Sequence, residues 1–188
     1  MAVHKEAGLN NTEGLDMADA LQLLIRGTII GLGGAALMDF WAITAKRAFG
    51  TRGLDYALLG RWIGHLARGR AFHESIASAD PINGERGLGW VAHYLIGIAF
   101  ALLLLTFQGL EWALAPTIWP ALLIGWATIV APWFIMQPGM GAGIAASKTP
   151  NPRSARLRNL ATHTIYGIGL YVTAVALSII WPIGNLGE

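Results

Sequence analysis

Hydrophobic positions fill four long stretches of the chain, and polar positions gather between them. The apolar stretches cover residues 21–45, 89–110, 113–136 and 160–181. A helix needs about 20 mostly apolar residues to cross the hydrocarbon core of a bilayer, and each stretch reaches that length. The pattern predicts an all-α integral membrane protein, a four-helix bundle in which residues 20–188 form a single four-span domain.

Composition narrows the class of protein further. Hydrophobic residues make up 54% of the chain and charged residues 13%, whereas soluble domains are about 25% charged, so an ordinary soluble domain is excluded. The net charge of +2 does not indicate a nucleic-acid partner, and the lack of cysteine excludes disulfides and thiolate metal centres. Residues 1–19 are polar, lack the pattern of a secretory signal, and are interpreted as a poorly ordered tail.

The positions of Lys and Arg predict the topology. Seven lie in the loop over residues 46–86 and four more between the third and fourth stretches, at Lys148, Arg153, Arg156 and Arg158. The opposite side carries Lys5 and Arg26. Because basic loops stay in the cytoplasm, we expect a bacterial inner-membrane protein with both long loops cytoplasmic and both termini periplasmic.

The first basic loop contains a further helical pattern. In "LDYALLGRWIGHLARG", residues 54–69, the apolar side chains recur on one side at helical spacing, and Arg61, His65 and Arg68 fall on the other. Tryptophan and arginine on an amphipathic helix are typical of a helix in the membrane interface. We therefore expect this helix on the inner leaflet, the alternative being a plain basic loop.

Polar side chains collect at the predicted cytoplasmic end of all four spans. Asp39 lies about 9 Å above the inner end of the first span, His93 and His163 begin the second and fourth, and Gln137 closes the third. An intramembrane carboxylate is costly and usually faces a partner or a wet cavity. These residues are predicted to form a ligand-binding pocket around Asp39. The alternative is that Asp39 only joins helices by a hydrogen bond to a histidine.

The second and fourth spans begin alike, with "HYLIGI" at His93 and "HTIYGI" at His163. This similarity suggests a faint parallel repeat of a two-helix unit. Residues four apart share a helix face, so a glycine beside each histidine leaves room for a flat ligand or for a neighbouring helix. Small residues at this spacing also pack membrane helices without any ligand.

Two histidines on separate helices are candidates for a cofactor site. Neutral imidazole binds metals and haem iron, so His93 and His163 with Asp39 would make a His–His–carboxylate site for a divalent metal. Alternatively, His93 and His163 would be the axial ligands of a haem. The sequence contains no local ligand set such as His-x-x-x-His, and an interfacial histidine is also explained by ordinary hydrogen bonding.

The other inner-side candidate is "MQPGMGAGIAASKTPNPRSARLRN", from Met136. It is not a P-loop, since Ser147 rather than glycine precedes the lysine and no strand comes before it. Lys148 and Arg153 next to helix N-termini favour an anionic small molecule or a lipid head group. Simple attraction of a basic loop to anionic lipid is the alternative.

Several motifs together resemble a known family. These are "MDFWA", "RWIGH", "GERGLGWVAHYLIGI", "MQPGMGAGIAASKTPNP" and "HTIYGIGLY". They resemble a family of small bacterial multi-pass membrane proteins that carries a domain-of-unknown-function label. The resemblance implies a four-span inner-membrane protein and no particular activity.

Three functions are compatible with the sequence. The first is binding or transport of a small ligand or ion through the Asp39 pocket, with the proline-rich third span as its flexible element. The second is a metal- or haem-dependent membrane enzyme or redox protein. The third is an accessory or assembly subunit, either as a homodimer or in a larger membrane complex. The sequence does not decide whether a reaction is catalysed.

Overall fold

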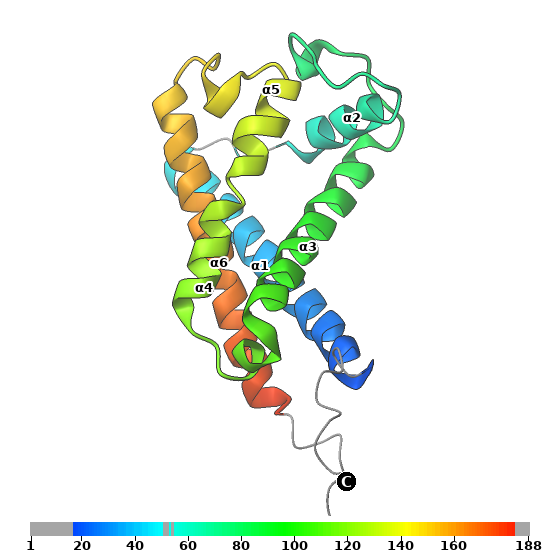
Figure 1. The fold of residues 1–188 in the computed structure, drawn as a ribbon. Coiled ribbons are helices and arrows are strands. Elements are labelled where there is room, and N and C mark those ends of the chain that lie inside the picture. The colour runs from blue at the N-terminus through cyan, green and yellow to red at the C-terminus, as the bar shows by residue number, and fades with distance from the viewer. Residues whose placement is uncertain (1–16, 51–52, 54, 183–188) are drawn as a thin grey trace, which may run out of the picture.

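The computed structural model describes residues 17–50, 53 and 55–182, and these residues are helical with connecting loops (Figure 1). Three long helices dominate, α1 over Met17–Phe49, α3 over Glu85–Leu114 and α6 over Pro152–Ile180. A fourth crossing consists of α4 over Ile118–Ala127, the π-helical segment η2 over Pro132–Met136 and α5 over Gln137–Gly139. The loops carry α2 over Tyr56–Leu66 and two short 3₁₀ turns, η1 over Ile76–Ser78 and η3 over Ile144–Ala146.

Four segments of this structure are long and apolar enough to cross a membrane, which confirms the predicted fold class. They are Met17–Phe49, Glu85–Leu114, Ile118–Gly139 and Pro152–Ile180. The first, second and fourth predicted stretches are shorter than the observed segments because these helices continue past their apolar part. The third crossing begins later than predicted, since Ala113 still belongs to α3 and Thr117 has an extended backbone before α4. The predicted tail, residues 1–19, lies outside the described residues except for Met17–Asp19, which begin α1.

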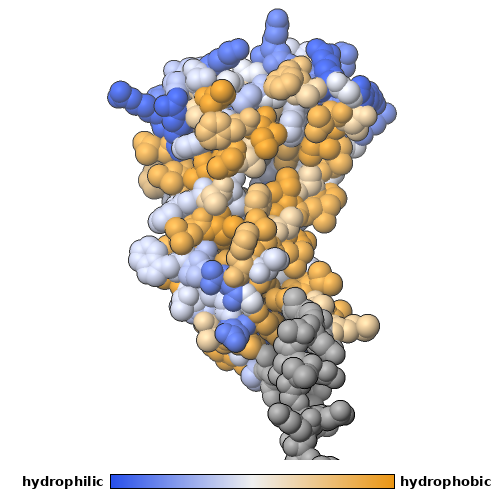
Figure 2. Space-filling model, in the orientation of Figure 1, coloured by the Kyte–Doolittle hydropathy of each residue, from blue (hydrophilic) through white to orange (hydrophobic). Residues whose placement is uncertain are grey.

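The helices form a bundle with two unlike ends. α1 contacts both α3 and α6, α4 lies against α6, and α2 packs against α3. One end, called the loop end below, carries α2, α5 and the loops around η1 and η3 (Figure 1). In Figure 2, hydrophilic residues gather at this end, above a largely hydrophobic body.

The glycines of the repeated His-x-x-x-Gly motif are helix-packing residues. A Cβ atom on Gly31 of α1 would lie 2.9 Å from the carbonyl oxygen of Gly97, which follows His93. A Cβ atom on Gly125 of α4 would lie 3.0 Å from Cα of Gly167, which follows His163. The pairs α1–α3 and α4–α6 thus meet through equivalent glycines, which agrees with a two-helix repeat and leaves no notch for a flat ligand.

The helix predicted over residues 54–69 exists as α2, but its surroundings differ from those of a free interfacial helix. Its apolar residues Leu59 and Trp62 are buried with Ile76 and Met140 in a small core at the loop end. On its polar side, His65 is only 6% exposed. Periodicity identifies an amphipathic helix, but it does not distinguish a lipid surface from a protein surface that covers the apolar side.

Candidate functional site

Asp39 lies in α1 at the level where α2 and α3 meet that helix. Its Oδ1 atom accepts a hydrogen bond from the Tyr56 hydroxyl at 2.6 Å, and its Oδ2 atom accepts one from the Tyr94 hydroxyl at 2.9 Å. The Nε2 atom of His93 lies 3.2 Å from the same Oδ1. Three helices therefore supply one group of polar side chains, called the Asp39 cluster, which consists of Asp39, Tyr56, His93 and Tyr94.

The hydrogen bonds locate the ring proton of His93. Tyr56 donates its hydroxyl proton to Asp39, so its oxygen acts as the acceptor toward His93 Nε2, 3.2 Å away. Both neighbours of Nε2 are then acceptors, and Nε2 must carry a proton to bond to either. A second proton would bind at Nδ1 and make His93 a cation beside Asp39 without breaking a bond of the cluster.

The cluster is largely but not completely buried. The side chains of Asp39 and His93 are each 13% exposed. The ring of Tyr56 lies 4.2 Å from the Trp90 ring and 4.6 Å from the His93 ring, measured between centroids. Burial, together with the hydrogen bond to Asp39, raises the pKa of Tyr56 above its ordinary range. Its hydroxyl therefore stays a donor at neutral pH.

Tyr56 reaches the cluster because α2 is held tightly against the start of α3. Asp55 caps α2 by accepting a hydrogen bond from the backbone nitrogen of Ala57 at 2.9 Å. A Cβ atom on Gly60 would overlap the carbonyl oxygen of Glu85. The two helices can therefore approach at backbone distance only because glycine has no side chain.

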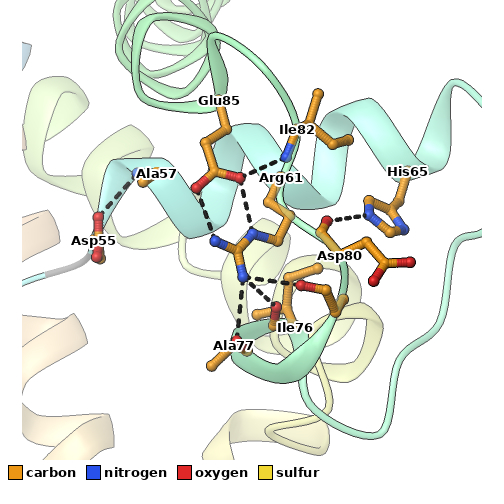
Figure 3. Close-up of polar contacts among 10 residues, drawn as sticks. Asp55, Ala57, Arg61, His65, Ile76, Ala77, Asp80, Ile82 and Glu85 are labelled. Carbon is orange, nitrogen blue, oxygen red and sulfur yellow. Dashed lines mark hydrogen bonds and ion pairs between the residues drawn. The ribbon is translucent and has the colours of Figure 1, made fainter.

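An ion pair fastens the same junction (Figure 3). The Nε and Nη2 atoms of Arg61 donate to the two carboxylate oxygens of Glu85, each at 2.8 Å. Nη1 donates to the carbonyl oxygens of Ile76, Ala77 and Ala79 at 3.3, 3.1 and 3.1 Å. Bidentate arginine–carboxylate pairs hold a fixed geometry, so Arg61, whose side chain is only 12% exposed, positions the helix that carries Tyr56.

His163 belongs to a different site. Its Nδ1 atom lies 2.7 Å from the hydroxyl of Thr128, which itself donates to the carbonyl oxygen of Gly125 at 2.6 Å. Because the hydroxyl proton is used there, the Nδ1 atom of His163 is the donor to Thr128. This histidine joins α6 to the end of α4.

The remaining predicted residues are also outside the Asp39 cluster. With the Asn159 amide oriented so that its oxygen faces two donors, that oxygen accepts from Gln137 at 2.7 Å and from Trp133 at 3.0 Å. Lys148 and Arg153 are exposed near the start of α6. The structure thus brings Asp39 and His93 together and leaves Gln137, Lys148 and Arg153 elsewhere at the loop end.

The predicted metal site is not formed by these side chains. Within the described ranges, no three His, Cys, Asp or Glu side chains gather in a group that could hold a metal ion. Asp39 and His93 pair with each other, while His163 bonds to Thr128. Haem ligation by His93 and His163 stays a prediction.

Tyr56 and Tyr94 were not predicted as site residues from the sequence. Tyr94 directly follows His93, and Tyr56 follows the capping residue Asp55 at the start of α2. A tyrosine inside an apolar span is a signal for a buried partner, because its hydroxyl needs a hydrogen bond. Tyr56 gives no such signal, since its partner is 17 residues away on another helix.

The chain was also compared with known proteins. Residues 28–177 match the model of a family described as "Protein of unknown function (DUF2938)". No curated protein and no solved structure matches the chain. The matched range contains the whole Asp39 cluster and His163, and the match confirms the family resemblance noted from the sequence motifs.

Proposed function

The chain belongs to this family of unknown function, and we propose that it is a bacterial inner-membrane protein that binds or transports a small ligand or ion through the Asp39 cluster. The observation that carries this proposal is the carboxylate inside a spanning helix, with hydrogen-bond donors from two other helices. Such intramembrane groups are typical of ion and proton pathways.

The chemistry of the cluster favours a proton as the ion that it takes most easily. Both oxygens of Asp39 already accept hydrogen bonds from tyrosines, so a metal or organic cation would have to displace one of them. A proton on His93 Nδ1 leaves those bonds in place and sets a positive charge beside the carboxylate. We therefore propose that ligand binding or transport is coupled to protonation of the Asp39–His93 pair.

The basic loops support the proposed orientation. Eleven of the 13 Lys and Arg residues fall within residues 46–86 and 148–158, and hydrophilic residues gather at the loop end (Figure 2). Because such loops stay on the cytoplasmic side, the cluster would open toward the cytoplasm, and both termini would be periplasmic. The exposed Lys148 and Arg153 would contact an anionic small molecule or a lipid head group there.

Infrared difference spectroscopy tests the protonation of the cluster. Spectra of the protein in lipid bilayers are taken at about pH 5.5 and about pH 8.5, on either side of the ordinary histidine pKa of about 6.5. We expect carboxylate, tyrosine and imidazole bands that are lost in Asp39→Asn and kept in Glu111→Gln, since Glu111 is exposed at the opposite end. Identical difference spectra for wild type and Asp39→Asn would refute the proposal.

Proteoliposomes with a trapped pH-sensitive dye test the transport step. Inorganic phosphate, small carboxylates and alkali cations are added outside in turn, and proton movement is recorded. A ligand coupled to the cluster moves protons with wild type and not with Asp39→Asn, while both proteins elute alike in gel filtration. Equal proton movement with both proteins would show that transport does not depend on Asp39.

One observation favours the accessory-subunit alternative. A groove of about 330 Å³ lies on the membrane-spanning part between α1 and α6. It is lined by Gly33, Ala36, Leu37, Phe40, Gly169, Val172 and Thr173. Small residues let another helix approach closely.

In this cysteine-free chain, a photo-crosslinker on Val172→Cys would then capture a protein in native membranes, whereas one on the exposed Val91→Cys would capture lipid. Lipid adducts at both positions would exclude this alternative.

A further inference from the structure

Two histidines outside the Asp39 cluster are buried at the loop end and bonded to each other. His65 of α2 is 6% exposed, and His73 of the following loop is 7% exposed. The Nδ1 atom of His65 lies 3.2 Å from Nε2 of His73. The outer nitrogens face backbone oxygens, with His65 Nε2 at 2.9 Å from Asp80 (Figure 3) and His73 Nδ1 at 3.2 Å from Gly139.

Counting protons along this row shows that two neutral rings cannot satisfy it. Each backbone oxygen is an acceptor, so both outer nitrogens must carry a proton. The contact between the rings needs one more proton, on either His65 Nδ1 or His73 Nε2. Three protons on four nitrogens exceed the two that a neutral pair holds, so the fully bonded row carries one positive charge.

We propose that His65 and His73 form a buried proton-binding site that holds one extra proton and thereby links the two long loops. The ligand is a proton, because every ring nitrogen already has a partner along the row. The site lies on the loops and does not depend on the proposed function of the Asp39 cluster.

The proton acts at a junction between distant segments. The backbone nitrogen of His73 donates to Gly139 at 2.9 Å, and that of Ile76 donates to Met140 at 3.0 Å. A Cβ atom on Gly141 would meet the backbone of Glu74, so the segments lie at backbone contact. Loss of the extra proton leaves two protons for three hydrogen bonds. One of the three then breaks, and the junction between the loops weakens.

Charged residues of both signs lie on the segments that carry or contact the pair. The carboxylates are Glu74 and Asp80 on the loop and Glu85 at the start of α3, and the cations are Arg61 of α2 with Arg68 and Arg70 after it. Arg61 and Glu85 neutralise each other in their ion pair. The segment 137–141 brings no titratable group. The remaining carboxylates, Asp80 and Glu74, are balanced in number by the remaining cations, Arg68 and Arg70, so the charge of the pair is argued from its hydrogen bonds alone.

Nitrogen NMR of the full chain in lipid bilayers, labelled with ¹⁵N-histidine, tests the proposal. Spectra are recorded at about pH 7.5, one unit above the ordinary histidine pKa of about 6.5, where an isolated imidazole is mostly neutral. We expect a doubly protonated ring signal that disappears in His65→Gln and also in His73→Gln. Either glutamine removes the need for the third ring proton, since a neutral amide can donate or leave one bond open.

The controls are His93→Gln and His163→Gln, which should keep that signal because their rings bond elsewhere. Because the two rings share one extra proton, the signal of the doubly protonated ring should be lost in both His65→Gln and His73→Gln. If the wild type lacks this signal, or if either His65→Gln or His73→Gln keeps it, the proposal is overturned.

A distance measurement on otherwise intact protein covers the case in which the glutamine variants do not fold. Spin labels are placed at Phe72→Cys and Ile144→Cys, which are 74% and 58% exposed in the wild type; the chain has no other cysteine. We expect a narrow distance distribution at about pH 5.5 and a broader one at about pH 8.5, either side of the histidine range. An unchanged distribution would contradict the proposal.

Discussion

At Asp39, two neutral phenols and one imidazole surround a carboxylate. A buried charge without partners would cost several kcal/mol, and the hydroxyls of Tyr56 and Tyr94 offset that cost without adding charge. His93 adds the only group of the cluster that can gain a proton without losing a bond. The same residues therefore stabilise the junction of three helices and give it a protonation-dependent charge.

Tyr94→Phe removes one donor and leaves the ring in place. A hydrogen bond to a charged group contributes about 1.5–3 kcal/mol, and partial exposure allows water to replace some of it, so we expect a loss of about 1–2 kcal/mol in the free energy of unfolding. Denaturant unfolding in detergent measures it. Tyr171→Phe, on a partly buried tyrosine of α6, is the control and should change stability by less. Equal effects would mean that the bond to Asp39 is not stabilising.

The raised pKa of Tyr56 predicts a pH dependence. A tyrosine whose pKa is higher in the folded than in the unfolded state contributes stability that is fully present below the unfolded pKa of about 10 and is lost as pH rises through the folded pKa. Wild-type stability should therefore fall at alkaline pH more steeply than that of Tyr56→Phe. Unfolding midpoints measured from about pH 8 upward test this. Parallel curves for the two proteins would contradict it.

Among the elements, α2 decides whether the cluster forms. Its first residue is Tyr56, its middle is fastened by Arg61, and its last turn carries His65. The contacts of Tyr56 and Arg61 depend on the close approach of α2 to the start of α3, whereas His65 bonds to the loop that follows α2. Glycines on both helices, Gly60 and Gly89, make this approach possible.

Gly89→Ala should displace α2. A Cβ atom there would overlap the carbonyl oxygen of Tyr56, and overpacking costs about 1–3 kcal/mol or more. The control is Gly87→Ala, two residues earlier in α3, where a Cβ would meet no atom within 4 Å and alanine should stabilise the helix by about 0.5–1 kcal/mol. Thermal unfolding of both variants tests the contrast, and a neutral Gly89→Ala would show that α2 is not held at this point.

At the scale of the whole molecule, one end of the bundle is polar and internally bonded. Both long loops meet there through His73 and Gly139, and α2, which carries Tyr56 of the Asp39 cluster, lies at the same end (Figure 1). The groove between α1 and α6 extends as far as Phe40, which is next to Asp39 in the chain. Asp39 itself bonds to side chains of α2 and α3, so the cluster and the groove lie on different sides of α1.

The proposed orientation predicts which residues a membrane-impermeant maleimide reaches in intact cells. Ser78→Cys and Ser147→Cys, exposed at the loop end, should react only after the membrane is permeabilised, because their loops would be cytoplasmic. Ala115→Cys, exposed between α3 and α4, should react in intact cells. The reverse pattern would invert the topology and place the cluster toward the periplasm.

Properties that depend on residues close together in the chain could be predicted from the amino-acid sequence. Four apolar stretches long enough to span a bilayer predict four crossing helices, and helical periodicity predicts α2, because both signals are local. Asp39 and His93 could also be predicted as candidate site residues, since a polar side chain in an apolar stretch can be recognised from the sequence.

Which polar residues contact each other depends on the packing of the folded chain. His93 and His163 stand in similar motifs, yet one faces Asp39 and the other Thr128. The crossing of α1 with α3, and of α4 with α6, sets these partners through glycine contacts. The buried row of His65 and His73 depends in the same way on two loops that are distant in the chain. Partner choice follows from how helices and loops pack against each other, which no local pattern contains.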